Sequence, residues 1–324
     1  MGRPDVTWDR GVHVLGSVLW LDARRPDVLT FLSSARVREA GRQVRALCSD
    51  RTRTIVRALR KDFSPLVAPF GQAIRLGPME LTLFPSGHMP GAAILRLATE
   101  GGVLAYASHV AMQPHALAEV PQVPKCDVLV VRADYGHLAV RLPPRNEALA
   151  RVVDVARQAL QAGRTPVFLG SLMGKSQEVV RALVDAGVPV KVHRTVAAVD
   201  GAYRALGFDP GAARQFRGGS APGCALVLPE TLRFRRTVQE VPRRHLVWLS
   251  GRALMPEVLA RMQVDEGIPL TGHLDPCGIE SLVERSGATR VVTVGHGAEA
   301  VAERARRRGL EALALHDEIQ LSMF

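Results

Sequence analysis

The sequence has little of several residue types on which common binding sites are built. Aromatic residues make up 5% of its 324 residues, so it offers few surfaces on which nucleic-acid bases can stack. Its four cysteines are widely spaced and form no C-x-x-C pair, which argues against a zinc knuckle or a disulfide framework. No apolar run approaches the roughly 20 residues that a membrane helix needs, and no basic and apolar leader opens the chain. We therefore expect a cytoplasmic protein without a membrane contact.

Apolar residues and positive charge are abundant. Hydrophobic residues make up 47% of the chain, which at this length predicts one large globular domain or two ordinary ones. The formal net charge is +11, and only four of the 42 basic residues are lysine. Such a surface attracts polyanions such as nucleic acid. An arginine bias of this kind also follows from GC-rich coding, so charge by itself leaves both explanations open.

Two kinds of pattern follow one another along the chain. The first third alternates short apolar segments with turns, which predicts mostly antiparallel strands, around an arginine-rich stretch at 35–61 that we expect to be helical. The near-continuous apolar run "CDVLVVRADYG" (126–136) is typical of a strand buried within a sheet. After it, amphipathic helical patterns alternate with short strand patterns, as in a doubly wound unit. The sequence therefore predicts an α/β (α+β) protein.

Three histidines lie beside glycines where predicted strands end. They are His88 in "SGHMPG", His273 in "LTGHLD" and His296 in "VGHG". Imidazoles at strand ends that meet in one crevice are suited to metal binding or to acid–base catalysis. One such histidine is usually structural, but three in similar settings favour a site.

Several segments occur in an order known from one family. These are "LTFLSSARVREA", "PSGHMPGAA", "LAYASHV", "CDVLVVRADYG", "GKSQ" and "PLTGHLD". Together they resemble the motifs of the metallo-β-lactamase-fold nucleases of the β-CASP group, above all the ligase-associated DNA exonucleases, which are similar to RNA 3′-end-processing exonucleases. The resemblance covers nearly the whole chain. It implies a metallo-β-lactamase-like αββα sandwich built from residues 1–137 and 263–324, with an inserted β-CASP-like α/β domain at 138–262.

The resemblance also implies that most of the catalytic equipment is replaced. The family's second motif supplies four metal ligands, its fourth motif an aspartate and its long strand a glutamate. The positions that match these are Ser34, Arg36, Arg38 and Glu39, then His109, then Arg132. The counterparts that remain are Asp22 of the first motif, His88 and His296 as vestigial metal ligands, and His273 with Asp275 as a vestigial acid–base pair.

These replacements disfavour metal binding. Two divalent ions need anionic ligands to activate water near neutral pH. His88, His109 and His296 would offer three imidazoles to a single zinc or manganese ion. Permanent positive charge on Arg36 and Arg38 would then lie close to that ion and cost several kcal/mol. We therefore expect no cofactor, with zinc or manganese present only if this reduced site is occupied.

The same arginines suggest a site for phosphate. The guanidinium groups of Arg36, Arg38 and Arg132 can each bind phosphate oxygens through two parallel hydrogen bonds without hydrolysing anything. Lys175 opens a predicted helix in "GKSQ", where backbone N–H groups can also meet a phosphate. The alternatives are a drifted pocket whose arginines bind local carboxylates, and ordinary helix capping at Lys175. Two further arginine-rich stretches, 233–245 and 303–309, either contact a nucleic-acid backbone or form solvated faces.

We expect a catalytically degenerate nuclease, a pseudoenzyme. It would bind DNA or RNA through backbone contacts, or act as a scaffold, in DNA repair or RNA processing. The resemblance implies partners as well, because active and degenerate subunits pair within the family: a homodimer, or a heteromer with an active nuclease or repair protein. Two alternatives stay open. One is an active phosphodiesterase with one metal ion and His273 as its acid, and the other is a protein-interaction scaffold without affinity for nucleic acid.

Overall fold

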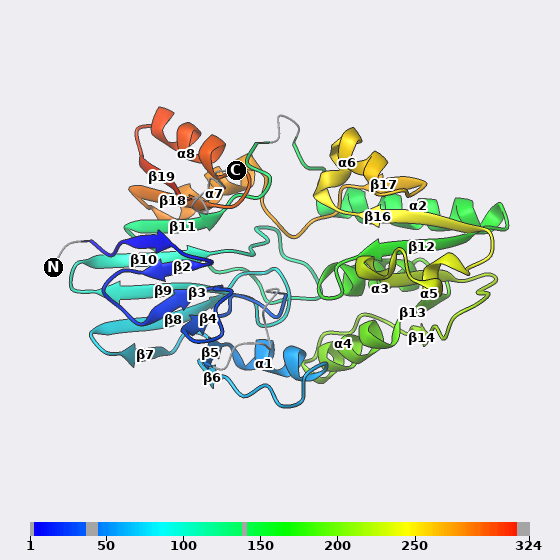
Figure 1. Ribbon diagram of the computed structural model, residues 1–324, viewed down its shortest axis with the longest axis horizontal. Helices are drawn as coiled ribbons and strands as arrows, with labels where there is room; N and C mark the ends of the chain where they lie inside the picture. Colours follow the sequence, from blue (N-terminus) through cyan, green and yellow to red (C-terminus); the bar gives the residue numbers. More distant parts are fainter. Residues whose placement is uncertain (1–2, 37–44, 138–140, 316–324) are drawn as a thin grey trace, which may run out of the picture. The chain divides into compact units, whose positions relative to one another are not determined.

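The computed structural model describes residues 3–36, 45–137 and 141–315, which form two compact units coloured along the chain in Figure 1. The first unit combines residues 1–141 and 273–324, and the second consists of residues 142–272. The second unit is thus one stretch of chain between the two parts of the first. We expected the middle domain to end at 262, but strand β17 (Glu266–Ile268) pairs with β16 (Arg244–Leu249) and keeps the next residues in the second unit.

Two sheets form the framework of the first unit. The first sheet has the spatial order β1 (Val6–Trp8), β2 (Val12–Val14), β3 (Leu19–Leu21), β4 (Leu29–Phe31), β5 (Arg45–Cys48) and β6 (Leu66–Val67). The second has the order β19 (Glu311–Leu315), β18 (Arg290–Val294), β11 (Val128–Arg132), β10 (Gly102–Ala107), β9 (Ala93–Thr99), β8 (Met79–Pro85) and β7 (Ala73–Leu76).

The direction of pairing changes within each sheet. Strands β1 to β3 and β7 to β10 pair antiparallel, whereas β3 to β6 pair in parallel, as do β10, β11, β18 and β19. The expectation of mostly antiparallel strands is therefore wrong for β3 to β6. Short apolar segments show that a strand is half-buried, but its direction depends on how far the chain travels before it pairs.

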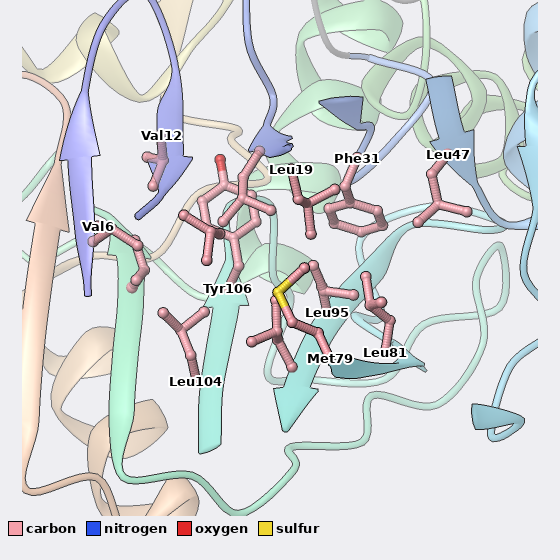
Figure 2. Packing of buried hydrophobic residues seen from close by; sticks show 14 of the residues in the cluster. Val6, Val12, Leu19, Phe31, Leu47, Met79, Leu81, Leu95, Leu104 and Tyr106 are labelled. Atoms are coloured by element: carbon pink, nitrogen blue, oxygen red, sulfur yellow. The ribbon is translucent and has the colours of Figure 1, made fainter. Parts of the chain in front are cut away.

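The two sheets face each other across an apolar core, shown in Figure 2. Leu19 and Phe31 of the first sheet are fully buried with Leu95 and Tyr106 of the second. Ile94, next to Leu95, belongs to a separate cluster on the other face of the second sheet. Burial of each such side chain contributes about 1.5–3 kcal/mol. The strand ends that carry polar residues are therefore fixed by a packed core.

Helices cover the other face of the second sheet. These helices are α7 (Pro276–Ser286) and α8 (Ala298–Arg307); the described part of this unit also contains helix α1 (Asp50–Arg57). Ile279 of α7 and Val301 of α8 pack with Leu129 and Val131 of β11. Strand β11 is thus buried on both faces, as its continuous apolar run predicts.

The second unit is a parallel α/β layer structure. Its sheet has the order β14 (Arg214–Gln215), β13 (Val190–Val192), β15 (Ala225–Pro229), β12 (Thr165–Gly170), β16 and β17, and neighbouring strands of this sheet pair in parallel. Its helices are α2 (Arg145–Gln161), α3 (Lys175–Asp185), α4 (Arg194–Ala205), α5 (Arg236–Gln239) and α6 (Pro256–Arg261), with 3-10 turns at Glu230–Leu232 and Gly251–Leu254. Val155 of α2 and Val179 of α3 pack against Phe168 and Val227 of the sheet. This is the alternation of helix and strand that the sequence predicts.

The arginine-rich stretch at 35–61 is not one helix. Strand β5 occupies Arg45–Cys48 and α1 occupies Asp50–Arg57, while 37–44 lie outside the described residues. Helix α1 begins where Ser49 accepts a hydrogen bond from the Thr52 N–H. Throughout the described chain, no helix has the length and apolar character to cross a membrane.

Candidate functional site

His88 lies on a turn after β8 that the neighbouring chain holds tightly. The Gly91 carbonyl accepts hydrogen bonds from the hydroxyls of Ser49, at 2.6 Å, and Thr52, at 2.9 Å. The Gly91 N–H donates to the Glu119 carboxylate at 3.1 and 3.2 Å. Gly91 has a φ of 78°, and a Cβ there would lie 2.4 Å from the Thr52 nitrogen, so only glycine fits. This turn buries His88 to 1% exposure.

Both carboxylate oxygens of Asp22 accept hydrogen bonds from neighbouring residues of the protein. Its Oδ1 accepts from the Ser33 N–H at 2.8 Å, and its Oδ2 accepts from the Ser33 hydroxyl at 2.6 Å and from the Tyr106 hydroxyl at 3.0 Å. Burial raises the pKa of Asp22, against the effect of these hydrogen bonds. Asp22 therefore fixes Ser33, whose hydroxyl lies 3.4 Å from the Nδ1 of His109.

Three imidazoles lie in succession, the first two stacked and the third tilted, and we call them the histidine row. The ring centroids of His88 and His109 are 5.2 Å apart with their planes at 26°, and those of His109 and His273 are 5.0 Å apart at 47°. The Tyr135 ring lies beyond, 5.8 Å from His273. The row thus joins the end of β8, the end of β10 and the segment before α7. The sequence pattern identified His88 and His273, and the family alignment added His109.

The pKa of His109 is strongly perturbed by its surroundings. Burial lowers its pKa well below the ordinary value, and electrostatic interactions with His273, Arg36 and Arg132 lower it further. Its imidazole is therefore neutral near pH 7. The Ser108 hydroxyl lies 3.2 Å from its Nδ1.

Asp134 is a site residue that the sequence analysis missed. Its Oδ2 accepts a hydrogen bond from the Arg132 Nε at 2.9 Å and lies 3.6 Å from the Nδ1 of His273. Asp134 raises the pKa of Arg132, against the opposing effect of burial. Asp134 follows Arg132 by two residues at the carboxyl end of β11, a position where polar residues commonly reach a site.

The Asp275 side chain caps a helix. Its Oδ1 accepts the Gly278 N–H at 2.8 Å, so this side chain caps the N-terminus of α7. We expected Asp275 beside His273 as part of a vestigial acid–base pair; the carboxylate of Asp134 also lies near this imidazole, 3.6 Å from its Nδ1.

The remaining predicted residues of the first unit are more scattered. His296 is exposed on the turn between β18 and α8, outside the histidine row. Arg36 is half-buried, and its charge acts on His109. Ser34 is fully buried, whereas Arg38 and Glu39 lie outside the described residues.

Lys175 lies in the second unit and is buried to 4% exposure. Its Nζ donates to the Leu249 carbonyl at 2.6 Å. Helix α3 is capped by Gln177, whose Oε1 accepts the Gly174 N–H at 2.9 Å. This geometry favours the structural explanation of "GKSQ" over a phosphate site.

The described residues do not fit the pair of divalent ions that the resemblance implies. Among them, no three His, Cys, Asp or Glu side chains are arranged to hold a metal ion. The carboxylate of Asp22 accepts from Ser33 and Tyr106, and that of Asp134 accepts from Arg132. The cationic charge that lowers the pKa of His109 also opposes a metal cation beside it.

Comparison with known proteins identifies homologues of very different coverage. No family model matches the sequence. Over 323 residues, 98% of this chain, it is 28% identical to a protein from Opitutus terrae named "Probable DNA ligase", of which the match covers 32%. Over 127 residues, 38% of this chain, it is 24% identical to "RNase aCSPSF2" from Saccharolobus solfataricus, of which the match covers 25%. The chain thus spans a third or less of the length of these relatives.

A solved structure shares the fold over the whole chain. It is the crystal structure of a protein of unknown function from Enterococcus faecalis V583, with a TM-score of 0.57 and 11% sequence identity. The match covers 98% of this chain and 97% of that one. At this identity the likeness concerns the fold only.

Proposed function

We propose that this chain, a member of the metallo-β-lactamase/β-CASP family, is a catalytically degenerate nuclease that binds nucleic acid without cleaving it. The observation that carries the proposal is the positive charge around His109, where the family has metal ligands. Arg36 and Arg132 both act on this imidazole. A cationic centre of this kind attracts phosphate and leaves no preorganised pair of metal ions to activate water.

Arg36 and Arg132 have different parts in the proposed phosphate site. Arg132 is oriented by Asp134, so its guanidinium holds a fixed direction. Arg36 is half-buried beside the histidine row and completes the positive field. Phosphate contacts of this type fix a nucleic acid in place without reading its sequence. Arg38 is included in the proposed site only because of the family resemblance.

The fold assignment belongs to the same proposal. Two sheets pack face to face, helices cover the outer face of the second, and a contiguous α/β unit divides the first unit in sequence. These features support a metallo-β-lactamase-like αββα sandwich with an inserted β-CASP-like domain.

A ligase or nuclease partner is the proposed context. This chain corresponds to 32% of a relative named as a probable DNA ligase. We infer that this chain acts together with an active nuclease or repair protein, in a heteromer or as a homodimer.

Binding of a labelled oligonucleotide at increasing salt tests the proposal. We expect Arg36→Ser to weaken binding and to reduce the slope of log K against log salt by about 0.7, the contribution of one phosphate contact on a single strand. The matched control is Arg60→Ser, which removes an exposed arginine paired with Asp62 in the same unit. Absence of binding by the wild-type protein at low salt would exclude the proposal and favour a pure protein scaffold.

An active phosphodiesterase is the second candidate, favoured by the close approach of three imidazoles in the histidine row. Metal analysis of the purified protein and a nuclease assay with zinc or manganese separate the two candidates. We expect no cleavage above background. Stoichiometric metal together with cleavage that His88→Ala abolishes would establish the enzyme instead.

A further inference from the structure

The segment 230–244 of the second unit, between β15 and β16, is rich in arginine. We call it the arginine segment. It contains Arg233, Arg235, Arg236, Arg243 and Arg244. Its two ends are tied together, because the Gln239 side chain donates to the Arg233 carbonyl at 2.8 Å and the Arg244 Nη1 donates to the Gln239 carbonyl at 2.7 Å.

The carboxylates of the segment leave most of this charge uncompensated. Glu230 accepts a hydrogen bond from the Trp248 indole at 3.0 Å, and Glu240 pairs with Arg236 at 2.8 Å. Arg243 donates to the Ala162 carbonyl at 3.0 Å, which does not neutralise its charge.

The charges of Arg235 and Arg244 are also uncompensated by a carboxylate within the described chain. Arg235 is exposed, and the Arg244 Nη2 donates to the neutral Gln239 side chain at 3.0 Å. Within the described chain, no ion pair to a carboxylate is formed by Arg233, Arg235, Arg243 or Arg244. The segment therefore has a positive field that attracts a polyanion.

Phe234 adds a stacking surface to this field. It is 62% exposed, and it is the one aromatic among the exposed large hydrophobic residues of the described chain. The Arg233 guanidinium carbon lies 4.0 Å from its ring centroid, so a cation covers one face of the ring. Arg233 is held in turn by the Met262 sulfur. An exposed aromatic ring fixed among free cations is the combination that binds unpaired bases and their phosphates.

We propose that the arginine segment is a binding site for single-stranded nucleic acid, in which a base stacks on Phe234 and phosphates contact Arg235 and Arg243. The inference rests on the proposed function, since it assumes that nucleic acid is the partner, and it adds a site in the other unit. Single strands are the expected form, because the bases of a duplex are already stacked on one another.

Fluorescence anisotropy with labelled oligothymidylate, oligouridylate and a DNA duplex tests the site. We expect Phe234→Ala to weaken binding to both single strands about fivefold or more, the loss expected for one stacked base. Binding to the duplex should stay within about twofold. We expect Arg235→Ser to lower the salt slope for single strands by about 0.7.

Two control variants separate this site from general surface effects. Leu15→Ala removes an exposed apolar side chain of the first unit, and Arg307→Ser removes an exposed arginine that pairs with Glu303. Both should bind single strands as the wild type does. If the wild type binds but Phe234→Ala and Arg235→Ser match these controls, the inference is wrong while the proposed function stands. If the wild type binds no oligonucleotide, both are wrong.

Discussion

Helix α8 and the arginine segment are both rich in arginine, but most of their arginines have different kinds of partner. In α8 and just after it, every arginine from 304 onward has a glutamate partner. The pairs are Arg304 with Glu280 at 2.8 Å, Arg306 with Glu299 at 3.1 Å, Arg308 with Glu284 at 2.5 Å, and Arg307 with Glu303. In the arginine segment Arg236 pairs with Glu240, but the partners of the other arginines are carbonyls, an amide, a thioether and an aromatic ring.

The difference teaches that a run of arginines is not by itself a basic surface. A carboxylate at hydrogen-bonding distance weakens the field that a phosphate would meet, whereas a carbonyl orients the guanidinium and leaves its full charge. The partners of Arg304 and Arg308 come from the neighbouring helix α7, so "ERARRRG" gives no hint of them. The two stretches are therefore different in kind, one neutralised and the other open to an anion.

The largest expected effect comes from removing the glutamates that pair with the arginines of α8 and with Arg308. We expect a variant with four glutamates replaced to bind oligonucleotides at least tenfold more tightly at low salt, because the freed arginines make new phosphate contacts. The salt slope on single strands should steepen by up to about 3, since each contact contributes about 0.7. Anisotropy at increasing salt measures both quantities. The substitutions are Glu280→Gln, Glu284→Gln, Glu299→Gln and Glu303→Gln.

A control variant with the same change in net charge isolates the effect of unpairing. It replaces exposed carboxylates that form no ion pair with an arginine in the described chain, so it frees no arginine. An equal gain in affinity from the control would show that net charge, and not the pairing in α8, decides binding. The control substitutions are Glu100→Gln, Glu147→Gln, Asp154→Asn and Glu257→Gln.

An intermediate effect is expected from pairing one arginine of the arginine segment with a new carboxylate. Gln239→Glu places a carboxylate where the Gln239 oxygen already accepts from Arg244. We expect the salt slope on single strands to fall by about 0.7 and the affinity to fall a few-fold. Gln239→Ala is the reference, because both variants lose the Gln239 bond to the Arg233 carbonyl but only one adds charge. Equal binding by the two variants would argue against electrostatic masking.

The smallest effect concerns stability. Arg307→Ser removes an i,i+4 ion pair, so the free energy of unfolding should fall by about 0.3 kcal/mol. Arg235→Ser removes no ion pair and places a preferred capping residue at the N-terminus of α5, so it should not lower the free energy of unfolding. Urea denaturation at low and high salt measures both, and the Arg307→Ser difference should shrink at high salt. A larger loss from Arg235→Ser would mean that Arg235 is bound within the fold.

The candidate site shows the same division between sequence and structure. Strand-end histidines and family motifs predicted His88 and His273, and homologues confirm the family resemblance. Asp134 was missed, because its role depends on which chain segment lies against the carboxyl end of β11. Asp275 and Lys175 were proposed as site residues from motif position, but each makes a local structural bond.

By itself, the sequence determined the family resemblance, the mixed α/β class and the buried strand β11, because each depends on composition, periodicity or motif order within a continuous stretch. It also determined which residue types replace the family's metal ligands. Only the tertiary structure decided which charges are neutralised and which imidazoles stack. These depend on distances of a few ångströms between residues far apart in the chain, and an electrostatic interaction falls off with that distance and with exposure to water.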